Sequence, residues 1–193
     1  LPSVAISSNS TICSGASATV TFTGTPNATV TYKINGGSNQ TIVLNASGSA
    51  SLVNTYNSTT TISLVSIASS GTPSCSQPQV GTVTITVIPL PIVTLSNNVN
   101  VCPNGSATVT FTGTPNATVT YNVNGGSNQT IVLNSSGTAT ITNTYSTTTT
   151  YNLVSITSAT TPACPQPQTG SVIVTVIPLP TVVISGNVTV CPN

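Results

Sequence analysis

The stretch Ala18–Tyr32 reads ATVTFTGTPNATVTY, and the same fifteen residues return unchanged at Ala107–Tyr121. Apolar side chains alternate with threonines in its two runs, ATVTF and ATVTY. A period of two places every apolar side chain on one face of a β-strand and is typical of half-buried strands. Between the runs, Gly24-Thr25-Pro26-Asn27 consists of residues that favour turns. The stretch therefore predicts two short strands joined by a turn.

The identity extends over a repeat of 89 residues. Residues 1–89 align with 90–178 without a gap, and 59 of the 89 positions are identical. Such a period is too long for one coil of a solenoid, and it suits β-sandwich domains of about 100 residues. We therefore predict one domain at 1–89 and a second at 90–178. The remaining residues, 179–193, are expected to be the start of a truncated third repeat.

Alternating patterns elsewhere in the repeat predict seven short strands and no helix. Asn35-Gly36-Gly37 is a strong hairpin signal, because Asn and Gly accept positive φ angles. In the first repeat the expected strands lie near residues 4–7, 18–23, 29–34, 42–44, 50–52, 60–68 and 82–88. The sequence therefore predicts an all-β fold of seven-stranded sandwiches in a linear array.

The near absence of charge limits the chemistry open to this chain. Among 193 residues there is one Lys and no Arg, Asp, Glu or His. General acid–base catalysis, calcium or magnesium sites and binding to a phosphate backbone all depend on such residues. Lys33 is replaced by Asn122 in the second repeat, so the repeats do not share it. We expect no enzyme, cofactor, metal site or nucleic-acid partner. No apolar run approaches 18 residues, so no membrane insertion is expected either.

Two cysteines occur at constant positions in each repeat, which indicates oxidation in an extracellular setting. The simplest expectation is a bond within each repeat, Cys13–Cys75 and Cys102–Cys164, with Cys191 belonging to the third repeat. Each bond would close a loop of about 62 residues and contribute roughly 4 kcal/mol in the chain-entropy model.

An alternative pairing joins neighbouring repeats. In a seven-stranded sandwich, the loop after the first strand and the loop before the last strand lie at opposite ends. A bond within the repeat therefore requires residues 70–79 to fold back toward Cys13. Otherwise the bonds link neighbours, as Cys13–Cys164 or Cys75–Cys102. Mapping of proteolytic peptides without reduction separates these possibilities.

The connector between the repeats is predicted to be stiff. Val87–Val93 reads VIPLPIV and contains no Gly or Ser. Its two prolines fix their own φ angles and bias the preceding residues toward extended conformations. Stiff connectors between near-identical domains favour a rod. Uncharged strand edges favour association with other copies, because charges normally block pairing between edges.

Aromatic residues are too few to indicate a sugar site on their own. Trp is absent, and Tyr32 and Tyr121 lie in the inward phase of their strands. Tyr56 and Tyr145 are candidate exposed rings, but we expect them to pack in the interior. A module that binds glycans or proteins would require exposed aromatic rings clustered on loops.

Three segments resemble a known family: TVVISGNVTVC at 181–191, CPNGSATVT at 102–110 and SVIVTV at 171–176. They are similar to the tandem Ig-like repeats of giant surface proteins of Bacteroidota, including gliding-motility and other adhesins. The resemblance implies tandem Ig-like β-sandwich domains at the cell surface. Related repeats usually contain Asp, which this chain lacks, so no calcium dependence is expected.

The predicted function is that of a structural repeat unit in an extracellular filament or adhesin stalk, forming a stiff rod held by disulfides. The expected partners are other copies of the chain or neighbouring repeats. The alternative is an adhesin module that binds surface glycans or proteins.

Overall fold

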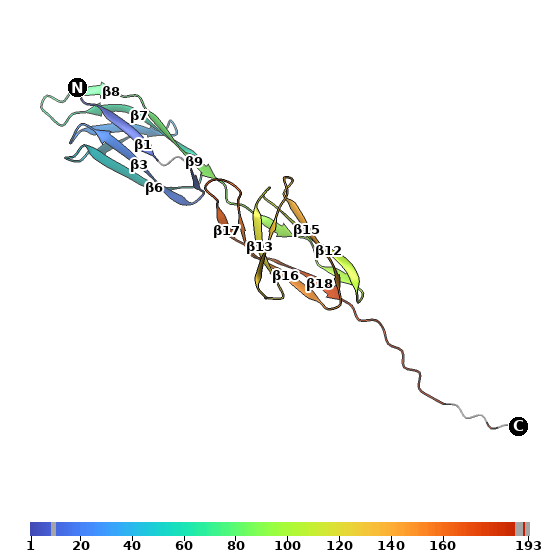
Figure 1. Ribbon diagram of the computed structural model, residues 1–193. Helices are drawn as coiled ribbons and strands as arrows, with labels where there is room; N and C mark the ends of the chain where they lie inside the picture. Colours follow the sequence, from blue (N-terminus) through green and yellow to red (C-terminus); the bar gives the residue numbers. More distant parts are fainter. Residues whose placement is uncertain (9–10, 188–190, 192–193) are drawn as a thin grey trace. The chain divides into compact units, whose positions relative to one another are not determined.

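The structure is a computed structural model that describes residues 1–8, 11–187 and 191 (Figure 1). Each 89-residue repeat contributes nine β-strands within this part of the chain. The described residues include no helix, and hence none long and apolar enough to cross a membrane.

The first repeat forms two sheets. The smaller sheet has the antiparallel order β1-β3-β6, with β1 at Val4–Ser8, β3 at Ala16–Gly24 and β6 at Ser49–Tyr56. The larger sheet has the order β2-β9-β7-β4-β5, and β8 also pairs with β7. Its strands are β2 (Thr11–Cys13), β4 (Thr29–Ile34), β5 (Asn39–Val43), β7 (Thr60–Ala68), β8 (Ser76–Pro78) and β9 (Thr82–Ile88). Strands β2 and β9 run parallel to each other.

The second repeat has the same strand order. Its smaller sheet is β10-β12-β15, with β10 at Val93–Leu95, β12 at Gly105–Gly113 and β15 at Thr138–Tyr145. Its larger sheet is β11-β18-β16-β13-β14, and β17 pairs with β16. Those strands are β11 (Val99–Val101), β13 (Thr118–Val123), β14 (Asn128–Val132), β16 (Thr149–Thr157), β17 (Pro165–Pro167) and β18 (Ser171–Val176).

The predicted alternation defines the interior of each sandwich. On β3, Ala18, Val20 and Phe22 are buried, and Thr19 and Thr21 on its other face are half-buried. The Phe22 ring packs on Tyr32 with 5.3 Å between ring centroids, and the equivalent pair in the second repeat lies 5.2 Å apart. The two hydrophobic cores are separate, and each draws its residues from one repeat.

The turn signals are confirmed in both repeats. Asn35 and Gly36 have φ angles of 49° and 69° in the hairpin between β4 and β5. Gly48, at φ 76°, lies so close to Gly24 that a Cβ there would collide with the Gly24 carbonyl oxygen. Only glycine therefore fits this turn without strain.

Two strands per repeat were missed by sequence reasoning. All seven predicted strands are present in the first repeat, and β2 and β8, of three residues each, add to them. Three residues are too short for an alternating pattern to be recognised. Residues 179–187 form no strand, and 188–190 and 192–193 of the expected third repeat lie outside the described residues.

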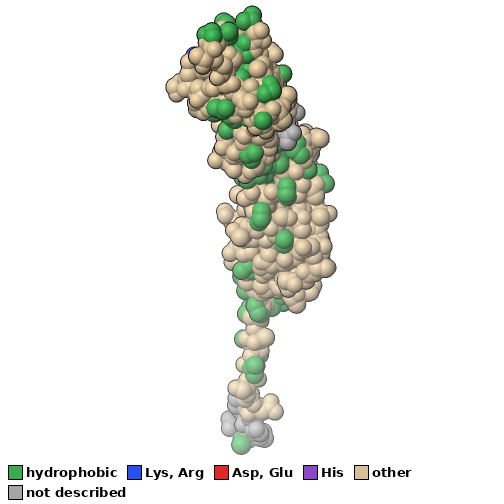
Figure 2. Space-filling view, turned by 90° about the vertical axis from the view of Figure 1, so that its left-hand side faces the viewer, with side chains coloured by type: hydrophobic (Ala, Val, Ile, Leu, Met, Phe, Trp, Pro, Cys, Tyr) green, Lys and Arg blue, Asp and Glu red, His purple; other side chains and the backbone are tan. Residues whose placement is uncertain are grey.

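The described chain divides into two compact units that cross the repeat boundary. One unit comprises Leu1–Pro91 together with Thr157–Gln166, and the other comprises Ile92–Ile156 and Pro167–Asn193. The predicted domain boundaries at 89 and 178 stay a prediction. On the face shown in Figure 2, scattered hydrophobic side chains lie among uncharged polar ones.

Candidate functional site: an interrepeat disulfide and a tyrosine pocket

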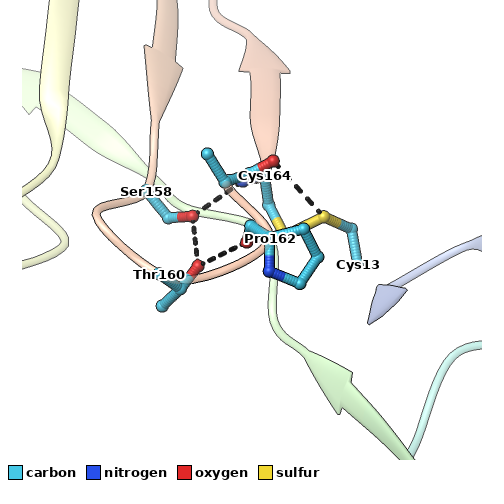
Figure 3. The surroundings of a disulfide bond; sticks show 6 residues. Cys13, Ser158, Thr160, Pro162 and Cys164 are labelled. Atoms are coloured by element: carbon cyan, nitrogen blue, oxygen red, sulfur yellow. Dashed lines mark hydrogen bonds between the residues drawn. A yellow bond between two sulfur atoms is a disulfide. The ribbon is translucent and has the colours of Figure 1, made fainter. Parts of the chain in front are cut away.

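A disulfide joins Cys13 of the first repeat to Cys164 of the second (Figure 3). The two residues are 151 positions apart in the chain, and their Cα atoms are 5.6 Å apart. Both lie in the compact unit that combines Leu1–Pro91 with Thr157–Gln166. The bond therefore connects a loop of the second repeat to the body of the first.

The pairing of β2 with β9 places Cys13 at the end of the first repeat where the chain leaves it. Cys13 is the last residue of β2 and lies opposite Ile88, the last residue of β9. The next residue, Ser14, donates its N–H to the Ile88 carbonyl oxygen at 2.8 Å. Because β2 and β9 are parallel, both end at the same edge of the sandwich. The second repeat begins a few residues after this edge.

Cys164 is held by a hydrogen-bonded loop between β16 and β17. The Ser158 N–H donates to the Cys164 carbonyl oxygen at 3.1 Å, and the Cys164 N–H donates to the Ser158 hydroxyl at 2.8 Å. The Thr160 hydroxyl donates to the Pro162 carbonyl oxygen at 3.0 Å, so its oxygen accepts from Ser158 at 2.6 Å. These contacts close the loop on itself, and Cys164 within it is fully buried.

The structure differs from the predicted pairing within each repeat. Cys13 bonds to Cys164, which is one of the two interrepeat pairings that the sequence left open. Cys75 and Cys102, the expected partners, are exposed free thiols, as is Cys191.

The reason for the difference is the strand order. Cys75 lies in the loop between β7 and β8. That loop is at the N-terminal end of the repeat, where Gln79 Oε1 accepts from the Val4 N–H at 3.4 Å. Cys13 lies at the opposite end, beside Ile88. The nine residues of β7 span about 30 Å, which a disulfide does not bridge.

A second candidate site is a pocket of about 400 Å³ in the second repeat. Tyr121, Tyr145 and Tyr151 line it together with polar side chains that include Gln129 and Asn143. The Tyr145 and Tyr151 hydroxyls lie 3.0 Å apart, and Tyr121 donates to Gln129 Oε1 at 3.1 Å. The pocket therefore presents hydroxyl and amide groups and no charge.

The tyrosine pocket favours neutral phenols. Burial is the main cause that raises the pKa of Tyr145, and the hydrogen bond with Tyr151 adds to it. Burial also raises the pKa of Tyr121 above its usual value. Both groups are therefore neutral hydrogen-bonding partners at neutral pH.

None of the five tyrosines offers an exposed ring. Tyr56 and Tyr145, the two candidates for surface positions, are only 7% and 5% exposed, as the expectation of a packing role required. The exposed aromatic cluster that a sugar-binding loop would need is not formed by any of the tyrosines, all of which lie in the described chain.

Comparison with known proteins bears on the fold. No family model matches the chain, and no curated protein matches it. A similar solved structure is a marsupial T cell receptor, with a TM-score of 0.54 and 14% identity over 96% of this chain and 76% of the receptor chain. Another is a Salmonella alpha-2-macroglobulin mutant, with a TM-score of 0.44 and 10% identity over 91% of this chain and 16% of that one.

At 14% identity, the likeness to the receptor concerns the fold alone. The narrower resemblance to surface proteins of Bacteroidota is not tested by these comparisons and stays a prediction. The receptor likeness agrees with the two-sheet arrangement of both repeats. The chain therefore has an all-β, immunoglobulin-like sandwich fold.

Proposed function

We propose that this chain is a structural repeat unit of an extracellular filament or adhesin stalk, in which disulfides hold successive Ig-like repeats together. The observation that carries the proposal is the Cys13–Cys164 bond, because it joins cysteines of two consecutive repeats. A disulfide that served only the stability of one sandwich would lie within one repeat. A bond between repeats restrains how far the two can separate or turn under load.

Composition and context support a passive mechanical role. Disulfides persist in oxidising surroundings, and Ig-like sandwiches are common in cell-surface proteins, so we place the chain outside the cell. The one-Lys composition makes its contacts with neighbours nearly independent of salt and pH. The same composition provides no acid–base pair for catalysis, so the proposal assigns no enzymatic activity.

Electron microscopy of a long array of this repeat tests the proposal. A stalk should appear as a straight fibre with an axial step of roughly 35–45 Å per repeat, estimated from strand rise and domain size. Reduction with dithiothreitol should make the fibre more flexible, and a Cys164→Ser array should already be flexible before reduction. Compact globules, or a flexible string of beads under oxidising conditions, would contradict the proposal.

A second candidate function is glycan binding. No tyrosine ring is exposed for stacking on a sugar, so this candidate rests on the hydroxyl and amide groups that line the pocket of the second repeat. Hydroxyl and amide groups around Tyr145 and Tyr151 match the hydrogen-bonding groups of a sugar ring. A glycan array probed with the two-repeat chain tests this function. Binding to a glycan on the array that is weaker in the Tyr145→Phe variant would support glycan binding. An array on which no glycan binds would contradict it.

A further inference from the structure

We propose that Cys13–Cys164 is one link in a series, in which the first cysteine of each repeat bonds to the second cysteine of the repeat that follows. Cys102 is then the site of a disulfide with a following repeat, and Cys75 is the site of a disulfide with a preceding one. The inference rests on the proposed function, and it assigns a role to two thiols that are free within this chain.

The loop that carries Cys75 already has the conformation of the loop that carries Cys164. The Ser69 N–H donates to the Cys75 carbonyl oxygen at 2.9 Å, and the Cys75 N–H donates to the Ser69 hydroxyl at 2.9 Å. Ser158 and Cys164 make the same two hydrogen bonds, at 3.1 and 2.8 Å. The loop of the first repeat therefore already holds Cys75 as the second repeat holds Cys164, but no cysteine of this chain is bonded to Cys75.

Cys102 lies at the end of its repeat that corresponds to the position of Cys13. It directly follows β11, which pairs in parallel with β18 so that Val101 lies opposite Val176. In the first repeat the corresponding residues, Ile12 and Val87, are paired in the same way. The Ile177 N–H donates to the Val101 carbonyl oxygen at 2.9 Å, which ties this edge to the strand by which the chain leaves the second repeat. Cys102 therefore marks the C-terminal end of its sandwich.

Exposure separates the bonded cysteines from the free ones. Cys164 is fully buried, whereas its equivalent Cys75 is exposed. Cys13 is half-buried, whereas its equivalent Cys102 is exposed. The equivalent cysteines therefore differ in whether a disulfide partner is present. In a further repeat of the same length, the second cysteine would lie 151 positions after Cys102, which is the spacing of the observed bond.

The bond forms by thiol–disulfide exchange with a disulfide oxidant, such as oxidised glutathione or a protein disulfide. The thiolate of one cysteine attacks the oxidant and forms a mixed disulfide, which releases one thiol of the oxidant. The second cysteine then attacks the mixed disulfide and releases the other. In total, two cysteine thiols lose two protons and two electrons, and the oxidant disulfide gains them as two thiols.

The 193-residue chain itself tests the inference, because the first repeat of one copy can serve as the repeat that follows another copy. We would concentrate a mixture of ¹⁴N- and ¹⁵N-labelled chains with oxidised glutathione, in a Cys191→Ser background that removes the remaining thiol. The products would be separated by non-reducing electrophoresis and mapped after pepsin digestion at acidic pH. The expected result is a ladder of oligomers whose linked peptides join Cys102 of one isotope to Cys75 of the other.

Matched variants define the direction of the links. Cys75→Ser alone and Cys102→Ser alone should each stay monomeric, and a mixture of the two should stop at dimers. A Cys75–Cys102 peptide found only within single-isotope chains, or the absence of a ladder, would overturn the inference. The same digest reports Cys13–Cys164 in every copy. If that bond is intact and the ladder is missing, the series fails while the proposed function stands; if that bond is missing, the proposed function fails.

Discussion

The two repeats fold alike but use their second cysteines differently. They share 59 of 89 residues and the same strand order. Cys164 of the second repeat is bonded and buried, while Cys75 of the first is free and exposed in a loop with the same hydrogen bonds. The comparison teaches that the sandwich fixes each cysteine at one end of a repeat, and that the same loop occurs both with and without a disulfide partner.

A second difference lies inside the sandwiches. Ile62 of the first repeat is replaced by Tyr151 in the second. As a result, the Tyr145 hydroxyl has Tyr151 as a hydrogen-bonding partner at 3.0 Å, while the equivalent Tyr56 hydroxyl is buried with no partner in the described structure. Both versions keep the same ring packing between Phe and Tyr on β3–β4 and β12–β13. The core therefore tolerates a change in polarity at this position.

The largest effect is expected from Cys164→Ser. The bond closes a loop across 151 positions, and losing it should lower the free energy of unfolding by about 5 kcal/mol in the chain-entropy model. Guanidinium denaturation under non-reducing conditions measures the change. Cys75→Ser is the matched control and should leave the midpoint unchanged. Equal shifts of the denaturation midpoint in the two variants would contradict the finding that Cys164 is bonded and Cys75 is free.

Core truncation should affect the repeats equally. Phe22→Ala and Phe111→Ala each remove a fully buried ring that packs on a tyrosine. Each should cost about 3–5 kcal/mol, because a cavity is left in a close-packed interior. Thermal unfolding followed by circular dichroism, in the Cys164→Ser background, compares the two variants. If the loss of unfolding free energy in one variant were less than about half of the loss in the other, the two cores would be less alike than their shared residues indicate.

Removing a single hydroxyl should have opposite consequences in the two repeats. Tyr145→Phe breaks the hydrogen bond with Tyr151 and should cost about 1 kcal/mol. Tyr56→Phe removes a buried hydroxyl that lacks a partner, so it should be neutral or stabilising. Chemical denaturation of both variants checks the sign. A destabilising Tyr56→Phe would reveal a partner for that hydroxyl.

The smallest effect is expected at alkaline pH. Burial first, and then the hydrogen bond to Tyr151, raise the pKa of Tyr145 above its usual value of 10. The folded chain thus favours the neutral phenol. This stabilisation is complete below about pH 10 and is lost as the pH rises toward the pKa of the folded state. Phenolate absorbance should therefore show late ionisation in the wild-type chain. Tyr145→Phe should lower the amplitude of this late component without removing it, because burial also raises the pKa of Tyr32 and of Tyr121. An unchanged amplitude in Tyr145→Phe would contradict the raised pKa of Tyr145.

The sandwich could be predicted from the sequence because the patterns that indicate strands and turns are local. The alternation in Ala18–Tyr32 and the Asn35-Gly36 turn depend on neighbouring residues, and both are confirmed. The cysteine pairing depends on which end of the sandwich each loop reaches, and that follows from the parallel pairing of β2 with β9. Because β2 has three residues, its sequence carried no recognisable strand pattern. Tyr151 was likewise missed as the partner of Tyr145, since β15 and β16 belong to different sheets and only the fold turns both side chains toward the same pocket.

Peptide mapping of the two-repeat chain without reduction tests the central claim most directly. The chain is digested with pepsin at acidic pH, which suppresses disulfide exchange because thiolates are scarce. The account predicts one linked peptide pair within each chain, containing Cys13 and Cys164. Peptide pairs that join Cys13 to Cys75 and Cys102 to Cys164 would contradict it, because each disulfide would then lie within one repeat.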